Sequence, residues 1–465
     1  MNLKYQLSIL KKYLKSIFPE FIINYFTQGN ERSLKTKKNI AASVIIKGLN
    51  IAISLLLVPL TINYINPTKY GVWLTLSSVI GWFGFFDIGF GNGLRNRFAE
   101  ALAKGKHELA RIYVSTTYAI LSIIIGVVLV IFIFINPFLN WAIIINTPST
   151  MTTELSLLAM IVFVFFSVQF VLQLITTIIT ANQQPAKSAF LYLLGNIFSL
   201  IVIFILTKST SGNLLYLGIA LSSAPVLVLA LSSLWFYGHS YKNYAPSFKY
   251  VRFKFARDLM SLGVKFFGLQ IAVILLYQTS NIIISQLFGP EQVTPYNIAF
   301  KYFSIITMVY SIILTPFWSA FTEAYTKKDL NWIRLSMKKL KSIWLLLIGA
   351  IILMILFSNT FYFLWVGNTV HVPMSITIVM ALYVMINLWN AIYSTFLNGV
   401  GHIKFQLVAG LIGALVNIPL SIYLGKTIGI SGVILSTAIL GLPGFIFYPM
   451  QYHKIIHFKA KGIWS

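Results

Sequence analysis

Three lysines inside long apolar runs are the residues of this chain best suited to bind an anion. A lysine left in lipid costs on the order of 3 kcal/mol, so Lys47, Lys265 and Lys301 each need a polar environment. Each side chain can snorkel to headgroups or line a hydrated cleft and bind an anionic headgroup. Lys47 and Lys265 lie at matching depths, about 12 Å and about 10 Å along their runs, which favours the cleft. For Lys301 both alternatives stay open.

Asp87 is an acid at the end of an apolar run, directly before the glycine-rich segment 89–93. A carboxylate in this position can bind H+ or Na+ and couple an ion gradient to transport. It can also form an ion pair with Arg95 or Arg97. We interpret Asp87 and Arg95 as candidate coupling or gating residues.

Amide side chains form a second polar set within the apolar runs. Asn387 and Asn390 are three residues apart, which places them on one helical face. Interhelical hydrogen bonds account for part of such a set, and a hydrated cleft that binds sugar hydroxyls accounts for the rest. We predict cleft positions for five amides: Asn50, Gln173, Gln270, Asn387 and Asn390.

Motifs of enzymes, metal sites and cofactor sites are missing from the sequence. The chain has no cysteine, no HExxH and no GxSxG motif. The segment 424–427 lacks the upstream glycine of a P-loop, and segment 89–93 lacks the spacing of a dinucleotide-binding motif. A membrane-bound polymerase or ligase would be expected to have a large external loop, and the sequence predicts only short external loops. We therefore predict a protein that is not an enzyme and that has no cofactor or metal.

The elements that position these residues are membrane helices. The chain has 465 residues, is 58% hydrophobic and carries only 10% charged residues. Runs of about 20 apolar residues are long enough to cross a bilayer, and the predicted fold is an all-α membrane protein. Twelve spans are predicted, at residues 39–63, 71–90, 112–135, 154–180, 188–207, 213–236, 258–288, 297–321, 342–363, 374–397, 405–424 and 431–450.

The distribution of cations predicts the orientation of these spans. Of 35 Lys and Arg residues, 29 lie in the N-terminal segment, the even-numbered gaps and the C-terminal tail, and three lie in the odd-numbered gaps. Cytoplasmic loops are enriched in Lys and Arg, so both termini are predicted to be cytoplasmic. We interpret the formal net charge of +25 as the result of membrane orientation and of attraction to anionic lipid headgroups. It therefore does not indicate a nucleic-acid partner.

A basic, tyrosine-rich gap divides the chain into two halves of six spans. Residues 48–52 (GLNIA) resemble residues 268–272 (GLQIA), and both follow a lysine. Two similar halves predict a transporter with a central cleft between two lobes. The predicted organisation is an N-terminal cytoplasmic or interfacial segment, an N-lobe, a linker, a C-lobe and a tail, at residues 1–38, 39–236, 237–257, 258–450 and 451–465.

The segment 66–118 resembles the span 2–3 region of bacterial O-antigen-type polysaccharide flippases. These proteins belong to the multidrug/oligosaccharidyl-lipid/polysaccharide exporter superfamily. The family's "YGxW" pattern matches at Tyr70, Gly71 and Trp73. Its "DxGxGNGLRN" pattern matches from Asp87 to Asn96, and residues 287–303 are similar to the family's span 7–8 turn.

This resemblance implies a transporter of the bacterial inner membrane that works by alternating access. Its substrate would be an undecaprenyl-pyrophosphate-linked oligosaccharide, an O-antigen or capsule-type repeat unit, whose headgroup binds the cleft lysines. The implied partners are that lipid-linked oligosaccharide, the membrane, a coupling ion (H+ or Na+) and the polysaccharide polymerase machinery. The alternative is a cation-coupled multidrug exporter of the same superfamily, which we would expect to carry acids in its cleft.

Overall fold

The computed structural model describes residues 31–87, 89–182 and 184–464, and nearly all of these lie in helices or helical turns. The side chains of residues 31–41 and of most of 261–277 lie outside the described part. Those of the predicted site residues Lys265 and Gln270 are among them. Residues 1–30, which make up most of the predicted N-terminal segment, also lie outside it.

The first half of the chain forms the helices of one group, joined by short turns. They are α3 (Glu31–Ile65), α4 (Pro67–Gly81), the 3-10 helix η1 (Trp82–Asp87), α5 (Phe90–Ala103), α6 (His107–Ile135), α7 (Trp141–Ile145), α8 (Thr152–Leu172), α9 (Leu174–Ala181), α10 (Pro185–Ser209) and α11 (Leu214–Gly238).

The second half begins after a linker of three 3-10 turns. These turns are η4 (Lys242–Tyr244), η5 (Phe248–Tyr250) and η6 (Phe253–Phe255). The helices that follow are α12 (Ala256–Phe288), η7 (Pro290–Gln292), α13 (Val293–Thr326), α14 (Leu330–Leu356), α15 (Ser358–Val366), α16 (Met374–Val400), α17 (Lys404–Ile428) and α18 (Ile430–Ile456).

Ten helices in the described part are long and apolar enough to cross a membrane, and they coincide with ten of the twelve predicted spans. The predicted span 71–90 is instead divided, because α4 ends after 15 residues and continues as η1. The predicted span 258–288 coincides with α12, which has 33 residues. Membrane crossing by these last two segments stays a prediction.

Side-chain caps fix where several helices begin. The Asn66 side chain accepts a hydrogen bond from the Lys69 backbone N–H at 3.0 Å, and Pro67 occupies the first helical position of α4. Asn213 and Asp329 cap α11 and α14 in the same way. Because a cap satisfies a backbone donor that the helix itself cannot, these residues place the turns between successive helices.

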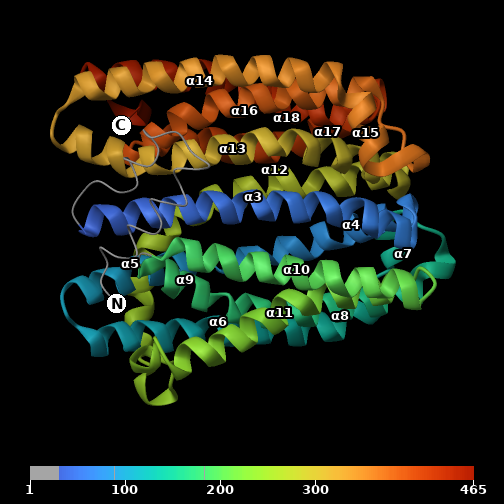
Figure 1. The fold of residues 1–465 in the computed structure, drawn as a ribbon, viewed down its shortest axis with the longest axis horizontal. Coiled ribbons are helices and arrows are strands. Elements are labelled where there is room, and N and C mark those ends of the chain that lie inside the picture. The colour runs from blue at the N-terminus through green and yellow to red at the C-terminus, as the bar shows by residue number, and fades with distance from the viewer. Residues whose placement is uncertain (1–30, 88, 183, 465) are drawn as a thin grey trace, which may run out of the picture.

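The helices form two antiparallel groups that lie one above the other in Figure 1. Helices α3, α6, α8, α10 and α11 pack among themselves, and so do α13, α14, α16, α17 and α18. Helix α12 lies between the groups and packs against α4 and α5 on one side and α17 on the other. The two halves of the sequence therefore meet mainly along α4, α5 and α12.

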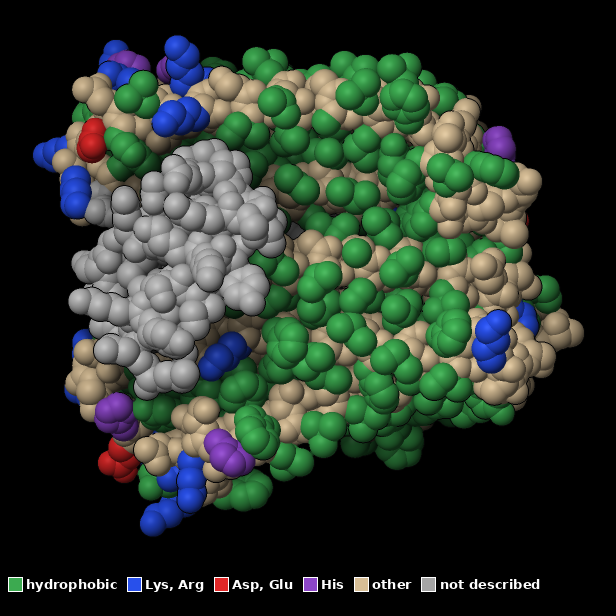
Figure 2. Space-filling model, in the orientation of Figure 1, with side chains coloured by type: hydrophobic (Ala, Val, Ile, Leu, Met, Phe, Trp, Pro, Cys, Tyr) green, Lys and Arg blue, Asp and Glu red, His purple; other side chains and the backbone are tan. Residues whose placement is uncertain are grey.

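One end of the bundle, which we call the basic end, carries the loops 104–106, 239–255, 327–329 and 401–403. Figure 2 shows Lys and Arg side chains gathered at this end, whereas the sides of the bundle are green with apolar side chains. Few cations lie at the other end, which we call the opposite end and which holds α7 and α15 (Figure 1). The charge asymmetry read from the sequence is thus an asymmetry in space.

Candidate functional site

A cavity of about 490 Å³ lies within the first group of helices, between α5 on one side and α8, α9 and α10 on the other. Its walls come from η1 and α5 and from α8, α9 and α10, and it lies toward the basic end, where α9 ends and α10 begins. This volume is within the usual range for a small-molecule site. The lining residues are Gly84, Asp87, Gly91, Asn92, Arg95, Phe166, Phe170, Gln173, Leu174, Thr176, Thr177, Thr180, Ser188 and Tyr192.

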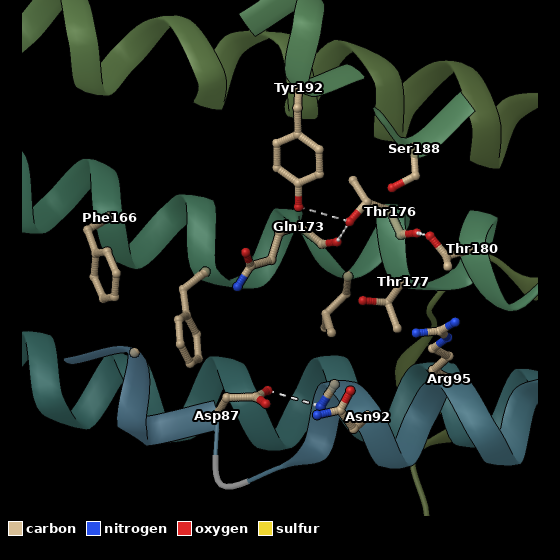
Figure 3. A pocket seen from close by; sticks show the side chains of 14 residues that line it. Asp87, Asn92, Arg95, Phe166, Gln173, Thr176, Thr177, Thr180, Ser188 and Tyr192 are labelled. Atoms are coloured by element: carbon tan, nitrogen blue, oxygen red, sulfur yellow. Dashed lines mark hydrogen bonds between the residues drawn. The ribbon is translucent and has the colours of Figure 1, made fainter. Parts of the chain in front are cut away.

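The glycine-rich turn between η1 and α5 builds the first wall. Gly89 is the N-cap of α5 and adopts a left-handed conformation with φ of 80°. Residues that carry a side chain rarely adopt this conformation. Gly93 lies against α12, where an added methyl group would be 2.0 Å from the Leu259 carbonyl oxygen. The turn therefore brings α5 close to α12 and aims Asp87 and Arg95 at the cavity (Figure 3).

The Asp87 carboxylate caps the start of α5. Its Oδ1 atom accepts a hydrogen bond from the Gly91 backbone N–H at 3.0 Å. An acid is favourable at this position because the N-terminus of a helix carries partial positive charge. Among the described ion pairs, none joins Asp87 to Arg95 or Arg97. The ion pair left open by the sequence is therefore replaced by a helix cap.

Arg97 is not among the residues that line the cavity, and its ion pair with Asp258 joins α5 to α12. Its guanidinium contacts Asp258 of α12 at 2.5 Å and Glu100 at 2.8 Å. The Tyr113 hydroxyl of α6 donates to the other oxygen of Asp258 at 2.8 Å. Hydrogen bonds from Lys104 and then Arg97 hold the pKa of the Glu100 carboxyl below its ordinary value.

Arg95 is the cation among the cavity-lining residues, and its side chain is exposed. Within the described part of the chain, no carboxylate forms an ion pair with it. A guanidinium offers five N–H donors in a planar fork that fits phosphate oxygens. The arrangement leaves that fork available to an anion that enters the cavity.

Hydroxyl groups line the second wall of the cavity. Thr176 donates to the Gln173 carbonyl oxygen at 2.7 Å, and Thr180 donates to the Thr176 carbonyl oxygen at 2.7 Å. The Tyr192 hydroxyl lies 3.3 Å from the Thr176 hydroxyl, and it must be the donor because the Thr176 hydrogen is already used. Figure 3 shows these groups facing Asp87, Asn92 and Arg95 across the cavity.

A break between α8 and α9 positions this wall. The α-helical hydrogen-bond pattern is interrupted at Gln173, which separates α8 from α9. The Thr176 N–H bonds the Gln173 carbonyl oxygen at 2.9 Å, three residues back. The Gln173 amide points into the cavity (Figure 3). The rings of Phe166 and Phe170 also line the cavity, with their centres 5.8 Å apart. The site therefore combines a cation, hydroxyls, amides and aromatic rings.

The structure brings three of the predicted site residues, Asp87, Arg95 and Gln173, into this one cavity. Lys47 and Lys301 are half-buried on α3 and α13 and are not among its lining residues. Lys47 lies close to the start of the apolar stretch Val44–Ile65. The side chains of Lys265 and Gln270 lie outside the described part of the chain, so their predicted roles are untested.

The other predicted amides take part in contacts between or within helices. Asn196 of α10 donates to Asn50 of α3 at 3.0 Å, and Asn387 donates to the Tyr383 hydroxyl at 3.2 Å. Asn390 donates to the Gly441 carbonyl oxygen at 2.9 Å, whereas its own Oδ1 is buried and has no hydrogen-bond partner in the described part. These amides lie outside the cavity.

The hydroxyl wall is the part of the site that sequence reasoning missed. Thr176, Thr177 and Thr180 follow Gln173 by three, four and seven residues, which is the spacing of one helical face. A search for polar residues at helical spacing after Gln173 would have found them. Ser188 and Tyr192 carry no such signal, because they come from the next helix.

Comparisons with known proteins identify the family. A family model described as polysaccharide biosynthesis protein matches residues 36–320, and one described as MatE matches residues 267–423. A candidate O-antigen transporter of Salmonella typhimurium is 22% identical over 421 residues, which is 88% of this chain and 94% of that protein. A candidate O-antigen export protein of Yersinia pseudotuberculosis is 22% identical over 356 residues, 75% of this chain and 79% of that protein.

Solved structures show the same fold. An inward-facing multidrug resistance MATE family transporter of the MOP superfamily superimposes with a TM-score of 0.71 at 12% identity, covering 91% of this chain and all of that one (100%). A Vibrio cholerae MATE transporter gives a TM-score of 0.64 at 14% identity, over 92% of this chain and 99% of that one. Because the first family model covers more than half of the sequence, the chain belongs to the polysaccharide biosynthesis protein family, as the resemblance of residues 66–118 predicted.

Proposed function

We propose that this protein flips an undecaprenyl-pyrophosphate-linked oligosaccharide across the bacterial inner membrane by alternating access. The family and the names of its relatives point to a polysaccharide transporter rather than an enzyme. The substrate has an anionic pyrophosphate, a polar saccharide and a long apolar tail. Each of these parts needs a different environment on the protein.

The observation that carries the proposal is the unpaired Arg95 beside a wall of hydroxyls. A pyrophosphate requires cations, and arginine binds phosphate oxygens with paired N–H donors. Arg95 has no ion-pair partner in the described part of the chain. A phosphate at this point therefore displaces no existing ion pair, which keeps the cost of binding low.

The rest of the cavity suits the saccharide next to the pyrophosphate. Sugar hydroxyls both donate and accept hydrogen bonds, and the hydroxyls of Thr177 and Ser188 can do the same. The Thr180 hydroxyl, whose hydrogen bonds the Thr176 carbonyl oxygen, can still accept one. The rings of Phe166 and Phe170 offer apolar surface to the sugar's C–H groups. A mixed lining of this kind holds a polar ligand without requiring one fixed sequence of sugars.

Lys47, Lys265 and Lys301 are proposed as further cations on the path of the headgroup. Lys47 lies on the first half of the chain, whereas Lys265 and Lys301 belong to the second. A headgroup that moves across the membrane needs successive positive positions, since charge is costly in the bilayer interior. The amides Asn50, Gln270, Asn387 and Asn390 are proposed as polar groups along the same path.

Contacts between the two halves at the opposite end support alternating access. Gln286 of α12 donates to the Ile143 and Ile144 carbonyl oxygens of α7 at 2.6 and 2.7 Å. Thr294 of α13 donates to the Pro67 carbonyl oxygen at 2.6 Å. These hydrogen bonds join the halves at the end away from the cavity, and they would have to break in a state that opens there.

The cation asymmetry supports the orientation. The basic end of the bundle would be cytoplasmic by the enrichment of Lys and Arg in cytoplasmic loops, and both termini would lie on that side. The cavity would then face the compartment in which the lipid-linked oligosaccharide is assembled. A coupling ion (H+ or Na+) and the polymerase machinery are proposed as partners because the family resemblance implies them.

A cation-coupled multidrug exporter is the second candidate, because MATE transporters share the fold. Such an exporter would need an acid that is available to a cationic drug or a coupling ion. Asp87 is the acid in the cavity, but its Oδ1 accepts the Gly91 N–H and Arg95 lines the same cavity. The cavity thus favours an anionic ligand over a cationic one.

Deletion of the gene tests the proposal. We expect surface polysaccharide to be lost while undecaprenyl-linked repeat units accumulate on the cytoplasmic leaflet. The wild-type gene should restore the polymer, whereas Arg95→Gln should restore less of it at equal protein level. Normal polymer in a deletion strain that lacks a paralogue would overturn the proposal, and lowered resistance to cationic dyes would favour the exporter.

A further inference from the structure

The linker between the two halves exposes aromatic side chains to an unusual degree. Phe248 of η5 is 95% exposed and Phe253 of η6 is 57% exposed. Large apolar side chains that protrude from a turn commonly mark a contact with a partner or a membrane. The linker lies outside the cavity, so the proposed transport does not explain this exposure.

Backbone hydrogen bonds hold the linker in a defined shape. The Ser247 N–H donates to the Ser115 hydroxyl of α6 at 3.1 Å. The Arg252 N–H donates to the Thr116 hydroxyl of the same helix at 3.0 Å. Because the residues on both sides of Phe248 are fixed to α6, its ring is held away from the protein.

Arg111 strengthens this attachment from α6. Its Nε atom donates to the Ala245 carbonyl oxygen at 3.1 Å, and its guanidinium lies 4.3 Å from the centre of the Tyr250 ring. The polar groups of this part of the linker are therefore directed toward α6. The Phe248 ring is directed outward, next to Lys249.

The linker lies beside the bundle rather than beyond its end. Helix α6 begins at His107, so Ser115 is about 12 Å along the helix at 1.5 Å per residue. Figure 1 shows the yellow-green linker protruding from the side of the bundle, next to α6 and α11 near the basic end. A segment at this level and on the perimeter would lie where the headgroups meet the acyl chains.

The charged residues of the linker sequence itself are all positive. Lys249, Arg252 and Lys254 are exposed, and the sequence has no Asp or Glu between Glu154 and Asp258. Exposed cations next to protruding aromatic rings are the composition of segments that bind anionic membrane surfaces.

We propose that residues 246–254 form an anchor in the leaflet at the basic end of the bundle. The Phe248 and Phe253 rings enter the boundary between headgroups and acyl chains. Lys249, Arg252 and Lys254 bind the phosphates of anionic phospholipids. The anchor fixes the linker between the two halves to the membrane, independently of any transported substrate.

The natural absence of cysteine allows a direct test. An environment-sensitive fluorophore is attached to Phe253→Cys in the purified full-length protein, which is placed in nanodiscs of phosphatidylcholine with phosphatidylglycerol. We expect blue-shifted emission and quenching by spin-labelled lipids. Adding Phe248→Ser should return the emission toward that of the fluorophore in water. The matched control is Lys106→Cys, an exposed loop position whose label should stay in water throughout.

The cations are tested with the same label. Each cation near an anionic surface contributes about a fivefold factor in binding. The Lys249→Gln/Arg252→Gln/Lys254→Gln variant should therefore need a much higher fraction of phosphatidylglycerol for the same shift. Because these side chains and Phe248 are exposed, the substitutions leave the packed core intact. Two results would overturn the anchor and leave this surface to a protein partner. One is water-like emission from the label at position 253 when the rest of the linker is wild type. The other is a blue shift that stays the same after Phe248→Ser and after the three lysine and arginine substitutions.

Discussion

Replacing Arg95 with glutamine would remove the cation from the cavity wall and leave the described fold contacts in place. Arg95 is exposed and lines the cavity, and it has no ion-pair partner among the described residues. The substitution therefore breaks no ion pair that stabilises the protein. We expect the thermal unfolding temperature of Arg95→Gln to match that of the wild type.

The loss of substrate affinity follows from the exposure of this side chain. Hydrogen bonds to charged groups contribute about 1.5–3 kcal/mol, and solvent screening favours the lower limit for an exposed group. About 1.5 kcal/mol corresponds to roughly a tenfold weaker affinity for undecaprenyl pyrophosphate. Arg95→Lys should lose less, because it keeps the charge but not the paired donors.

Binding of undecaprenyl pyrophosphate to the purified protein in detergent measures this difference. Lys106→Gln is the matched control, since it removes an exposed cation from the basic end but not from the cavity. The loss for Arg95→Gln should shrink as the salt concentration rises. Equal affinities for the wild type and Arg95→Gln, or equal losses for Arg95→Gln and Lys106→Gln, would refute the assignment of Arg95 as the phosphate ligand.

Three further predictions concern the helices around the cavity and the opposite end. Gly93→Ala should destabilise the protein by about 1–3 kcal/mol in detergent unfolding, because the new methyl group would lie 2.0 Å from the Leu259 carbonyl oxygen. Gly126→Ala is the control and should show no loss, since nothing lies within 4 Å of the new methyl group and alanine favours a helix interior. Asp87→Ala should cost about 1 kcal/mol by removing the cap of α5, whereas Asp87→Asn keeps an acceptor, so equal losses in the same assay would contradict the capping role. Gln286→Ala should favour opening at the opposite end, seen as faster thiol labelling of a buried Ser78→Cys probe; unchanged labelling would contradict the role of Gln286.

The helices could be predicted because bilayer thickness sets a length that apolar runs reveal. Ten predicted spans coincide with long apolar helices. The division of the predicted span 71–90 could not be read in this way, since the η1 segment is as apolar as a helix. Helix α14 begins at Leu330, before the predicted start at 342, because charged residues at the basic end continue the helix beyond the apolar run.

Three of the predicted site residues, two of them charged and one an amide, line the cavity, whereas the amide Asn92 was not predicted. Asp87, Arg95 and Gln173 stand out in an apolar sequence, and the structure brings them together. Hydroxyl residues such as Thr176 are common in membrane helices and bond their own backbone, so hydropathy gives them no special signal. Their convergence depends on how α9 and α10 pack, which spacing along one helix does not reveal.

The contacts at the opposite end could not be predicted from local patterns. Gln286 and Ile143 are 143 residues apart in sequence, and neither belongs to a motif that specifies the other. Their hydrogen bond depends on how the two halves are arranged in this state. A transporter that changes state makes such contacts in one arrangement and breaks them in another.

The most direct test of the proposed function is transport by the purified protein. Full-length protein is reconstituted into liposomes that carry a fluorescent undecaprenyl-pyrophosphate-linked oligosaccharide, and a membrane-impermeant reagent follows the lipid in each leaflet. We predict protein-dependent flipping, slowed by roughly tenfold in Arg95→Gln when substrate binding limits the rate. Vesicles in which the wild-type protein leaves the lipid in its original leaflet while it moves a cationic dye would contradict the proposed function.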